Sequence, residues 1–212
     1  MSAAAPPAGA EPASHVLYLH GFRSSPQSTK ARRVGAWLAE HHSDVRFWCP
    51  QLPASPQQAV AEVLDGIAGW PSERMAVFGS SLGGFYATVV AERRGCRAVV
   101  LNPAVEPARD LAAAVGATTT WHGDEPFVFR PEYIAELRAL TPPQPLTKPE
   151  LTFAIIAKGD EVLSWQEMSA RYAGCRMRLL EGGDHALSDF EAHLADTMAF
   201  IGLEPNARST SG

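Results

Sequence analysis

The sequence has only three cysteines, Cys49, Cys96 and Cys175, and they are too far apart to form a CxxC pair. This scarcity excludes the common spacings of a structural zinc site, and an odd, scattered set is a poor basis for a disulfide framework. We therefore expect reduced, mostly buried thiols and a cytoplasmic location.

Long apolar runs and basic clusters are also missing. No apolar stretch approaches the roughly 18 residues of a membrane-spanning helix, and residues 1–14 lack the basic and apolar regions of a signal peptide. We expect a flexible leader over 1–14 and a flexible tail over 204–212, because both are rich in small and polar residues. The net charge of -5 and the isoelectric point near 5.8 argue against nucleic acid or an anionic membrane as a main partner.

What the sequence does contain is an alternation of short apolar runs with longer amphipathic stretches over residues 15–203, which is enough chain for one domain. Most of the apolar runs show no polar alternation, as is typical of strands buried on both faces. The alternation predicts an α/β fold, with a mostly parallel sheet of about six strands and helices on both faces. The expected strands are 15–20, 45–49, 75–79, 98–102, 152–158 and 177–181, and the expected helices are 27–42, 56–69, 82–94, 131–140, 165–173 and 187–201.

A long connection separates the fourth and fifth expected strands. We expect an insertion over about 104–150, because long excursions inside a compact domain are often functional lids. The alternative is an ordinary helical insertion that covers the edge of the sheet. In the same way, four aromatic residues of this segment either roof an apolar pocket or form the insertion's own core: Trp121, Phe127, Phe129 and Tyr133.

The segment GSSLGG, residues 79–84, lies between an expected strand and an expected helix. This is the carboxyl edge of the sheet, where open parallel sheets bind ligands. A phosphate-binding loop is disfavoured because neither G-x-G-x-x-G nor G-x-x-x-x-G-K-[ST] is present. A tight turn whose glycines only permit close packing is a second hypothesis. The third is a nucleophile elbow, G-x-S-x-G, in which Gly79 and Gly83 flank a central Ser81 that projects above the sheet.

A serine nucleophile needs a histidine base and an acid that orients the histidine. In proteins with a nucleophile elbow, the three residues follow along the chain in the order Ser, Asp/Glu, His. Of the seven histidines, only His185 lies in a glycine-rich loop after the last expected strand; the alternative is a solvent-exposed loop histidine. Asp160 enters the loop after strand 152–158 first and is the expected acid, with Glu161 as the alternative. Asp184 is expected to form local hydrogen bonds in the loop instead.

The backbone N–H groups that would stabilise an oxyanion are also predictable. One should be that of Leu82, directly after the nucleophile, and the other should come from the loop after the first strand, where Gly21 permits a turn and Phe22 N–H faces the site. His20 either lines the pocket or packs at the strand end, and we favour packing.

The segments YLHGFRSSPQSTKA, PQLP, GSSLGGFYAT, NPAVEP, GDEVL and EGGDHA together resemble the YqiA/YcfP-like family of small α/β-hydrolase esterases, from about residue 15 to residue 203. The resemblance implies a compact α/β-hydrolase that lacks the first antiparallel strands of larger relatives and acts on carboxylic esters or acyl thioesters. The family's triad falls on Ser81, Asp160 and His185. Segment 104–150 is the part that matches least, so a substrate range is not implied.

The expected function is therefore a serine hydrolase of the carboxylesterase type, acting on a small acyl ester or thioester without a metal or organic cofactor. An acyl-CoA thioesterase, another hydrolase on the same fold, and a non-catalytic binding module are the alternatives, because a fold does not fix a function. The sequence does not indicate the oligomeric state.

Overall fold

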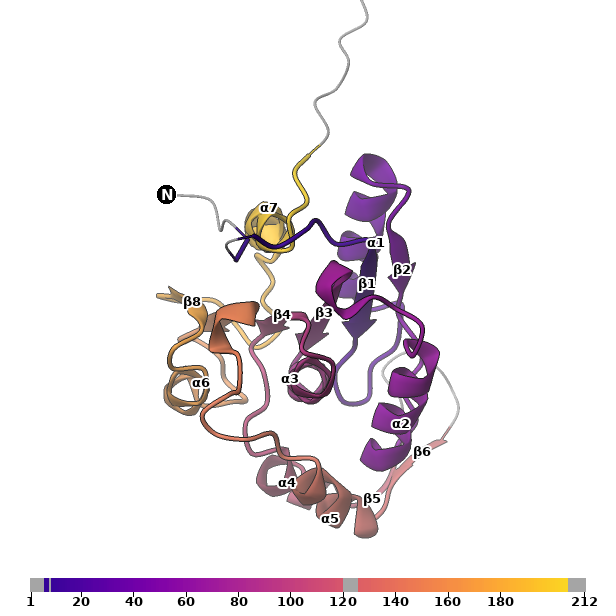
Figure 1. Cartoon of the computed structure of the whole chain (residues 1–212). Coiled ribbons are helices and arrows are strands. Elements are labelled where there is room, and N and C mark those ends of the chain that lie inside the picture. Colours follow the sequence, from indigo (N-terminus) through magenta and orange to yellow (C-terminus); the bar gives the residue numbers. More distant parts are fainter. Residues whose placement is uncertain (1–5, 8, 120–125, 206–212) are drawn as a thin grey trace, which may run out of the picture.

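A six-stranded sheet forms the centre of the molecule. The computed structural model describes residues 6–7, 9–119 and 126–205 of the 212-residue chain. Six strands pair in the order β2-β1-β3-β4-β7-β8, and all of their pairings are parallel, which confirms the expected α/β class (Figure 1). Every residue of β3, β4 and β7 is buried, which explains the absence of polar alternation. The strands are β1 (His15–Leu19), β2 (Arg46–Trp48), β3 (Met75–Ser80), β4 (Arg97–Leu101), β7 (Thr152–Ala157) and β8 (Arg176–Leu180).

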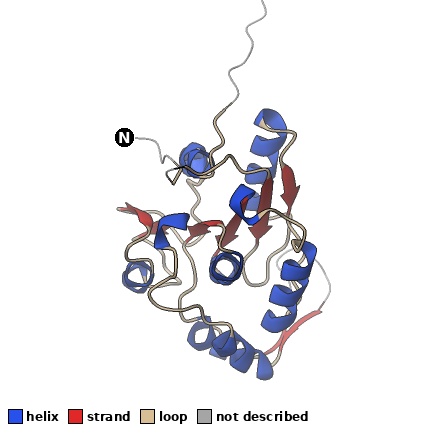
Figure 2. Cartoon of the chain, viewed as in Figure 1, coloured by secondary structure: helices blue, strands red, loops and turns tan. Residues whose placement is uncertain are grey.

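Helices cover both faces of this sheet (Figures 1 and 2). Helices α1 (Thr29–His41) and α7 (Glu191–Phe200) pack on one face, and α2 (Pro56–Gly66), α3 (Leu82–Arg94) and α6 (Trp165–Arg171) pack on the other. Alternate residues of each strand enter the two cores, since Leu17 and Leu19 face α2 and α3 whereas Val16 and Tyr18 face α1. A short 3-10 helix, η1 (Ser72–Arg74), leads into β3.

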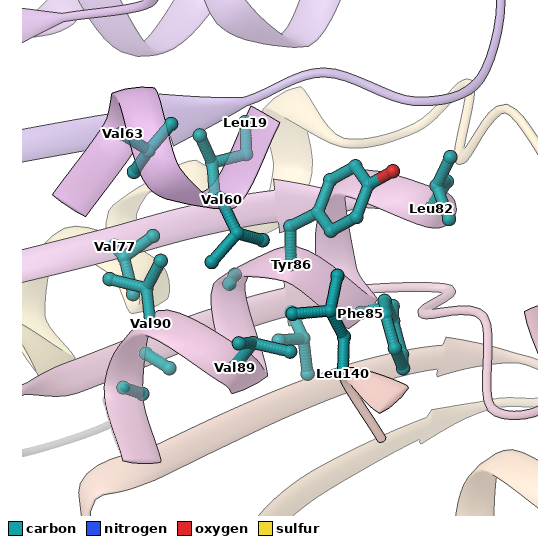
Figure 3. Packing of buried hydrophobic residues seen from close by; sticks show 14 of the residues in the cluster. Leu19, Val60, Val63, Val77, Leu82, Phe85, Tyr86, Val89, Val90 and Leu140 are labelled. Carbon is teal, nitrogen blue, oxygen red and sulfur yellow. The ribbon is translucent and has the colours of Figure 1, made fainter. Parts of the chain in front are cut away.

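Helix α3 lies in the middle of its face and is buried from Leu82 to Ala91. Its apolar side chains pack between the strands and α2, where they meet Leu19, Val60 and Val77 (Figure 3). Each fully buried side chain of this size contributes about 1.5–3 kcal/mol relative to an exposed one. Burial on several sides therefore fixes the amino end of α3, which directly follows Ser81.

The expected insertion lies between β4 and β7. It contains α4 (Pro107–Asp110), η2 (Ala112–Ala114), β5 (Gly116–Thr119), β6 (Pro126–Phe129), α5 (Glu132–Ala139) and η3 (Pro149–Leu151), and β5 and β6 form a separate antiparallel pair. Only α5 was predicted among these elements, because strands and helices of three or four residues are too short to show a periodicity. Whether the insertion acts as a lid stays a prediction.

Several polar contacts attach the insertion to the rest of the domain, and two of them involve carboxylates of α5 and α6. The Glu136 carboxylate of α5 accepts hydrogen bonds from Ser55 Oγ (2.7 Å) and from the Gln57 N–H (3.0 Å) at the amino end of α2. Arg109 of α4 donates two hydrogen bonds to the Glu167 carboxylate of α6, at 2.9 and 2.7 Å.

A few expected boundaries are wrong. Helix α7 begins at residue 191 rather than 187, because the Asp184 carboxylate accepts hydrogen bonds from Ser188 N–H (2.9 Å) and Oγ (2.6 Å) and holds a turn there. The expected leader is also too long, because Ala13 is buried and its N–H donates to the Ile201 carbonyl (3.0 Å). Most of the expected tail, 206–212, lies outside the described residues. None of the helices in the described ranges is long and apolar enough to cross a membrane.

Candidate active site

Ser81 forms a sharp turn between β3 and α3, with φ 56° and ψ -123°. A residue other than glycine rarely adopts a positive φ, so surrounding bonds must hold this conformation. The Ser81 N–H donates to the Leu101 carbonyl, and the Ser81 carbonyl accepts from the Ala104 N–H, each at 3.0 Å. These bonds attach the turn to the adjacent end of β4 and hold Ser81 in this conformation.

The two glycines of the expected elbow lie where no side chain fits. A Cβ on Gly79 would lie 2.0 Å from the Gly83 carbonyl oxygen, and a Cβ on Gly83 would lie 2.0 Å from the Leu19 carbonyl oxygen. The first turn of α3 therefore packs directly against the backbone of β1 and β3. This contact places Ser81 at the carboxyl edge of the sheet.

His185 and Asp160 lie beside Ser81, as the spacing predicted. His185 Nε2 is 3.1 Å from Ser81 Oγ, and His185 Nδ1 is 2.8 Å from Asp160 Oδ2. The ionised carboxylate only accepts, so Nδ1–H donates to it, and Nε2 of the neutral imidazole accepts from the serine hydroxyl. The three side chains form a continuous hydrogen-bonded chain, although they come from three separate loops.

The environment of Asp160 keeps it ionised. Its side chain is fully buried, and Oδ1 accepts from the N–H groups of Val162 and Leu163, each at 2.8 Å. Burial alone would raise the pKa of Asp160, but the hydrogen bonds from His185, Leu163 and Val162 outweigh it and lower the pKa. Asp160 is therefore a carboxylate at neutral pH and can stabilise a positively charged imidazole.

The neighbouring carboxylates have other partners. Glu161, the alternative acid, accepts a hydrogen bond from the backbone N–H of His185 at 2.9 Å instead of contacting the ring. Asp184 contacts Ser188, as described above, which agrees with its expected role in the loop. The structure thus brings Asp160, rather than Glu161, to the imidazole.

The loop after β1 passes directly beside the serine. A Cβ on Gly21 would lie 3.4 Å from the Ser81 Cβ, and Gly21 and Phe22 line the same cavity as Ser81 and His185. Leu82 is the first residue of α3, and the first N–H groups of a helix have no acceptor within the helix. The two expected N–H donors therefore lie on segments that border the serine.

The cavity at the serine has a volume of about 510 Å³. The charged residues of its lining are Arg23, Lys30 and Asp110, and Lys30 Nζ donates a hydrogen bond to the carbonyl of Ala186, which directly follows His185. Apolar side chains from α3, the insertion and the loop before α6 form much of the remaining wall: Leu82, Ala104, Pro107, Leu111, Val162 and Leu163.

The aromatic residues of the insertion do not roof this cavity, so that interpretation is wrong for the three that the structure describes. The Phe127 and Phe129 rings each contact Phe22 edge to face, with centroids 5.3 Å apart, and Tyr133 contacts Phe129 at 5.5 Å. They pack behind Phe22 as part of a core. Trp121 lies outside the described residues.

His20 packs at the end of β1, as favoured, but it also lines the cavity, so both expected roles apply. Its Nε2 accepts from the Leu52 N–H (3.1 Å), so the proton is on Nδ1, which donates to the Gly21 carbonyl (3.0 Å). Burial lowers the pKa of His20 although the bond to Gly21 opposes this effect. His20 is therefore a neutral connection between the loops that follow β1 and β2.

Sequence reasoning missed Asn102, which directly follows β4 and is fully buried beside the His185 loop. An asparagine at the carboxyl end of a buried strand was the available signal.

Other nucleophiles and metal sites find no support in the described part of the chain. No group of three or more His, Cys, Asp or Glu side chains among the described residues is arranged to hold a metal ion. All three cysteines are free thiols. Burial raises the pKa of Cys49 and Cys96 to about 12 and that of Cys175 to about 11, so little reactive thiolate forms at neutral pH.

Known proteins share this architecture. The mouse α/β hydrolase domain-containing protein 10 superposes with a TM-score of 0.66 at 17% identity, and 88% of each chain is covered. A structure from work on the metagenome-derived lipolytic enzymes LipS and LipT gives a TM-score of 0.64 at 20% identity, covering 93% of this chain and 99% of that one. The esterase domain of a Rhodothermus marinus protein gives 0.60 at 17% identity, covering 93% and 87%. At these identities the similarity shows an α/β-hydrolase fold.

A family model covers nearly all of the folded chain. The model of the Uncharacterised protein family (UPF0227), the YqiA/YcfP-like family named above, matches residues 15–202. This match includes all six strands of the main sheet and the three loops that carry Ser81, Asp160 and His185. The chain belongs to the UPF0227 family.

Proposed function

We propose that this protein is a serine hydrolase of the carboxylesterase type. The observation that carries the proposal is the chain of hydrogen bonds from Ser81 Oγ to His185 Nε2 and from His185 Nδ1 to Asp160 Oδ2, at the wall of a cavity. The esterase and lipolytic enzymes among the structural neighbours support the same class of reaction.

In the proposed mechanism, Ser81 Oγ bonds to the acyl carbon while its proton passes to His185 Nε2. Asp160 holds the imidazole in the required tautomer and stabilises its charged form. The N–H groups of Phe22 and Leu82 donate to the oxyanion of the tetrahedral intermediate. The C–O or C–S bond then breaks, the leaving group takes the proton from His185, and a water activated by His185 releases the acid. Neither a metal nor an organic cofactor is needed for these steps.

The cavity favours a small acyl ester or thioester as the substrate. A volume of about 510 Å³ is in the range of pockets for small organic molecules. The apolar wall formed by residues such as Leu111 and Leu163 suits an acyl group, because burying its methylenes there is favourable. We propose carboxylic esters as the first class to test, and acyl-CoA thioesters as the second, because the same mechanism cleaves both.

The experiment that tests the proposal is labelling with a fluorophosphonate, followed by intact mass and peptide mapping. We expect a single adduct on Ser81 and none in Ser81→Ala. The matched control is Ser80→Ala, which replaces the adjacent serine at the end of β3. With p-nitrophenyl esters, Ser81→Ala should lower kcat by roughly 10⁴- to 10⁶-fold, whereas Ser80→Ala should have a far smaller effect.

Three results would contradict parts of this proposal. Equal losses in the two variants would reject the assignment of Ser81. A wild-type protein that neither reacts with the probe nor hydrolyses esters, acyl-CoAs or anilides would support the non-catalytic binding module instead. If the protein hydrolysed only acyl-CoAs, the proposed mechanism would stand, but the substrate class would be thioesters rather than esters.

A further inference from the structure

Asn102 is a buried polar residue in an unusual backbone conformation. It directly follows β4, its exposed fraction is 0%, and its φ is 41°. Its N–H donates to the Ile155 carbonyl of β7 at 3.0 Å, so the backbone still belongs to the edge of the sheet. A buried amide side chain is costly unless its hydrogen bonds are formed, so its partners indicate its role.

The Asn102 amide joins two segments that carry the proposed catalytic groups. Its Oδ1 accepts from the Ala157 N–H at 2.8 Å, at the end of β7 and three residues before Asp160. Its Nδ2 donates to the Asp184 carbonyl at 2.9 Å and to the His185 carbonyl at 3.2 Å. Both N–H donors and the oxygen of the amide are therefore used.

These contacts hold His185 through its main chain. Asn102 binds the carbonyl of His185, and Glu161 accepts from its N–H at 2.9 Å. The peptide groups on both sides of the His185 Cα are thus fixed, and Asp160 fixes the ring. Each of these partners lies at the carboxyl edge of β4 or β7, so the sheet defines where the imidazole lies.

Asparagine meets the local requirements better than its close analogues. It tolerates the left-handed backbone region better than most residues, and its short amide has both donors and an acceptor. Aspartate has the same shape and keeps the acceptor, but loses the two N–H donors. Glycine accepts the backbone conformation, but loses the amide altogether.

We propose that Asn102 is a positioning residue for His185, which sets the imidazole between Ser81 and Asp160 by holding the loop carbonyls to the end of β7. This proposal rests on the proposed hydrolase function. In the proposed mechanism, Asn102 does not touch the reacting atoms. Its loss should therefore reduce turnover more than substrate binding, because a displacement of about 1 Å in a catalytic group can cost on the order of 10²-fold in rate.

The test measures kcat and KM of Asn102→Gly, Asn102→Asp and wild type. The concentration of active sites, by which kcat is calculated, is determined by titration with a fluorophosphonate. The control is Thr197→Val, which removes a fully buried hydroxyl that donates to the Leu194 carbonyl (2.7 Å) on α7. We expect both Asn102 variants to lose about 10²-fold in kcat with KM within about threefold of wild type. The control should lose stability and keep its kcat.

A second measurement needs no turnover. The imidazole Nδ1–H of His185, bonded to Asp160, should give a resolved proton resonance in ¹H–¹⁵N spectra of wild type, and the Asn102 variants should shift or broaden it. Folded Asn102 variants with a kcat within about twofold of wild type and an unchanged resonance would overturn the inference. A wild type without activity would reject the proposed function alone, because the resonance would still report whether Asn102 positions His185.

Discussion

At the scale of single residues, each polar atom of His185 has its own partner. Nδ1 contacts Asp160, Nε2 contacts Ser81, and the backbone N–H donates to Glu161. The two adjacent carboxylates therefore act on different atoms of one histidine. Replacing them one at a time should separate the orientation of the ring from the support of its loop.

We predict that Asp160→Asn lowers kcat by about 10⁴-fold, because an amide at this position can donate to Nδ1 and favour the wrong imidazole tautomer. Glu161→Gln keeps an oxygen that can accept from the His185 N–H, so it should lower kcat by less than about 10-fold. Initial rates with a p-nitrophenyl ester measure both effects. If Glu161→Gln had the larger effect, Glu161 would be the functional acid.

Sequence position identified some residues of the site and not others. Ser81, Asp160 and His185 each occupy a fixed place after a strand, so chain order alone predicted that they would meet. The roles of Asn102 and His20 depend on contacts with residues 82 and 32 positions away and on the direction of their side chains. A periodicity carries no information about such contacts.

At the scale of elements, the elbow depends on the close approach of α3 to the sheet. The strands were predictable because they are buried on both faces, and α3 because it follows a glycine-rich turn. The short strands of the insertion were not, because four residues do not show a period. The sequence also left open whether the aromatic residues roof a pocket or form a core, because the direction of Phe127 and Phe129 depends on how the β5–β6 pair packs against Phe22.

We predict that Gly83→Ala destabilises the protein by at least about 3 kcal/mol, because the new Cβ would lie 2.0 Å from the Leu19 carbonyl oxygen and backbone must move. The control is Gly69→Ala, where a Cβ meets no atom within 4 Å, so the change should be about 0.5 kcal/mol or less. Urea denaturation of the two variants measures the difference. Similar midpoints would mean that α3 can move away from β1, and the rigid elbow would be refuted.

At the scale of the whole molecule, the sheet separates two apolar cores, and the proposed site lies at its carboxyl edge. Two buried polar side chains connect loops of this edge to one another. His20 joins the loops after β1 and β2, and Asn102 joins the end of β7 to the loop after β8. Such groups couple the stability of the fold to pH when they titrate.

His20 gives this coupling a definite sign. Burial lowers its pKa in the folded protein below the value of 6.5 that applies to an exposed histidine. Between the lowered value and 6.5, the unfolded chain binds more protons than the folded one, so stability rises with pH in this window. The contribution of His20 to the free energy of unfolding is complete above pH 6.5 and is lost as the pH falls towards the lowered pKa.

We therefore predict that the free energy of unfolding of wild type decreases between pH 7.5 and pH 5.5, with a slope from His20 of up to about 1.4 kcal/mol per pH unit. His20→Gln keeps hydrogen-bonding groups but does not titrate, so its free energy of unfolding should depend less on pH, whatever its absolute value. The pKa of His15 is also lowered, by burial and by Arg46 and Arg74, but His15 is present in both proteins and cancels in the comparison. Urea denaturation at a series of pH values gives the two slopes. Equal slopes would mean that His20 accepts a proton without loss of the fold, and that the loop after β1 is held by other contacts.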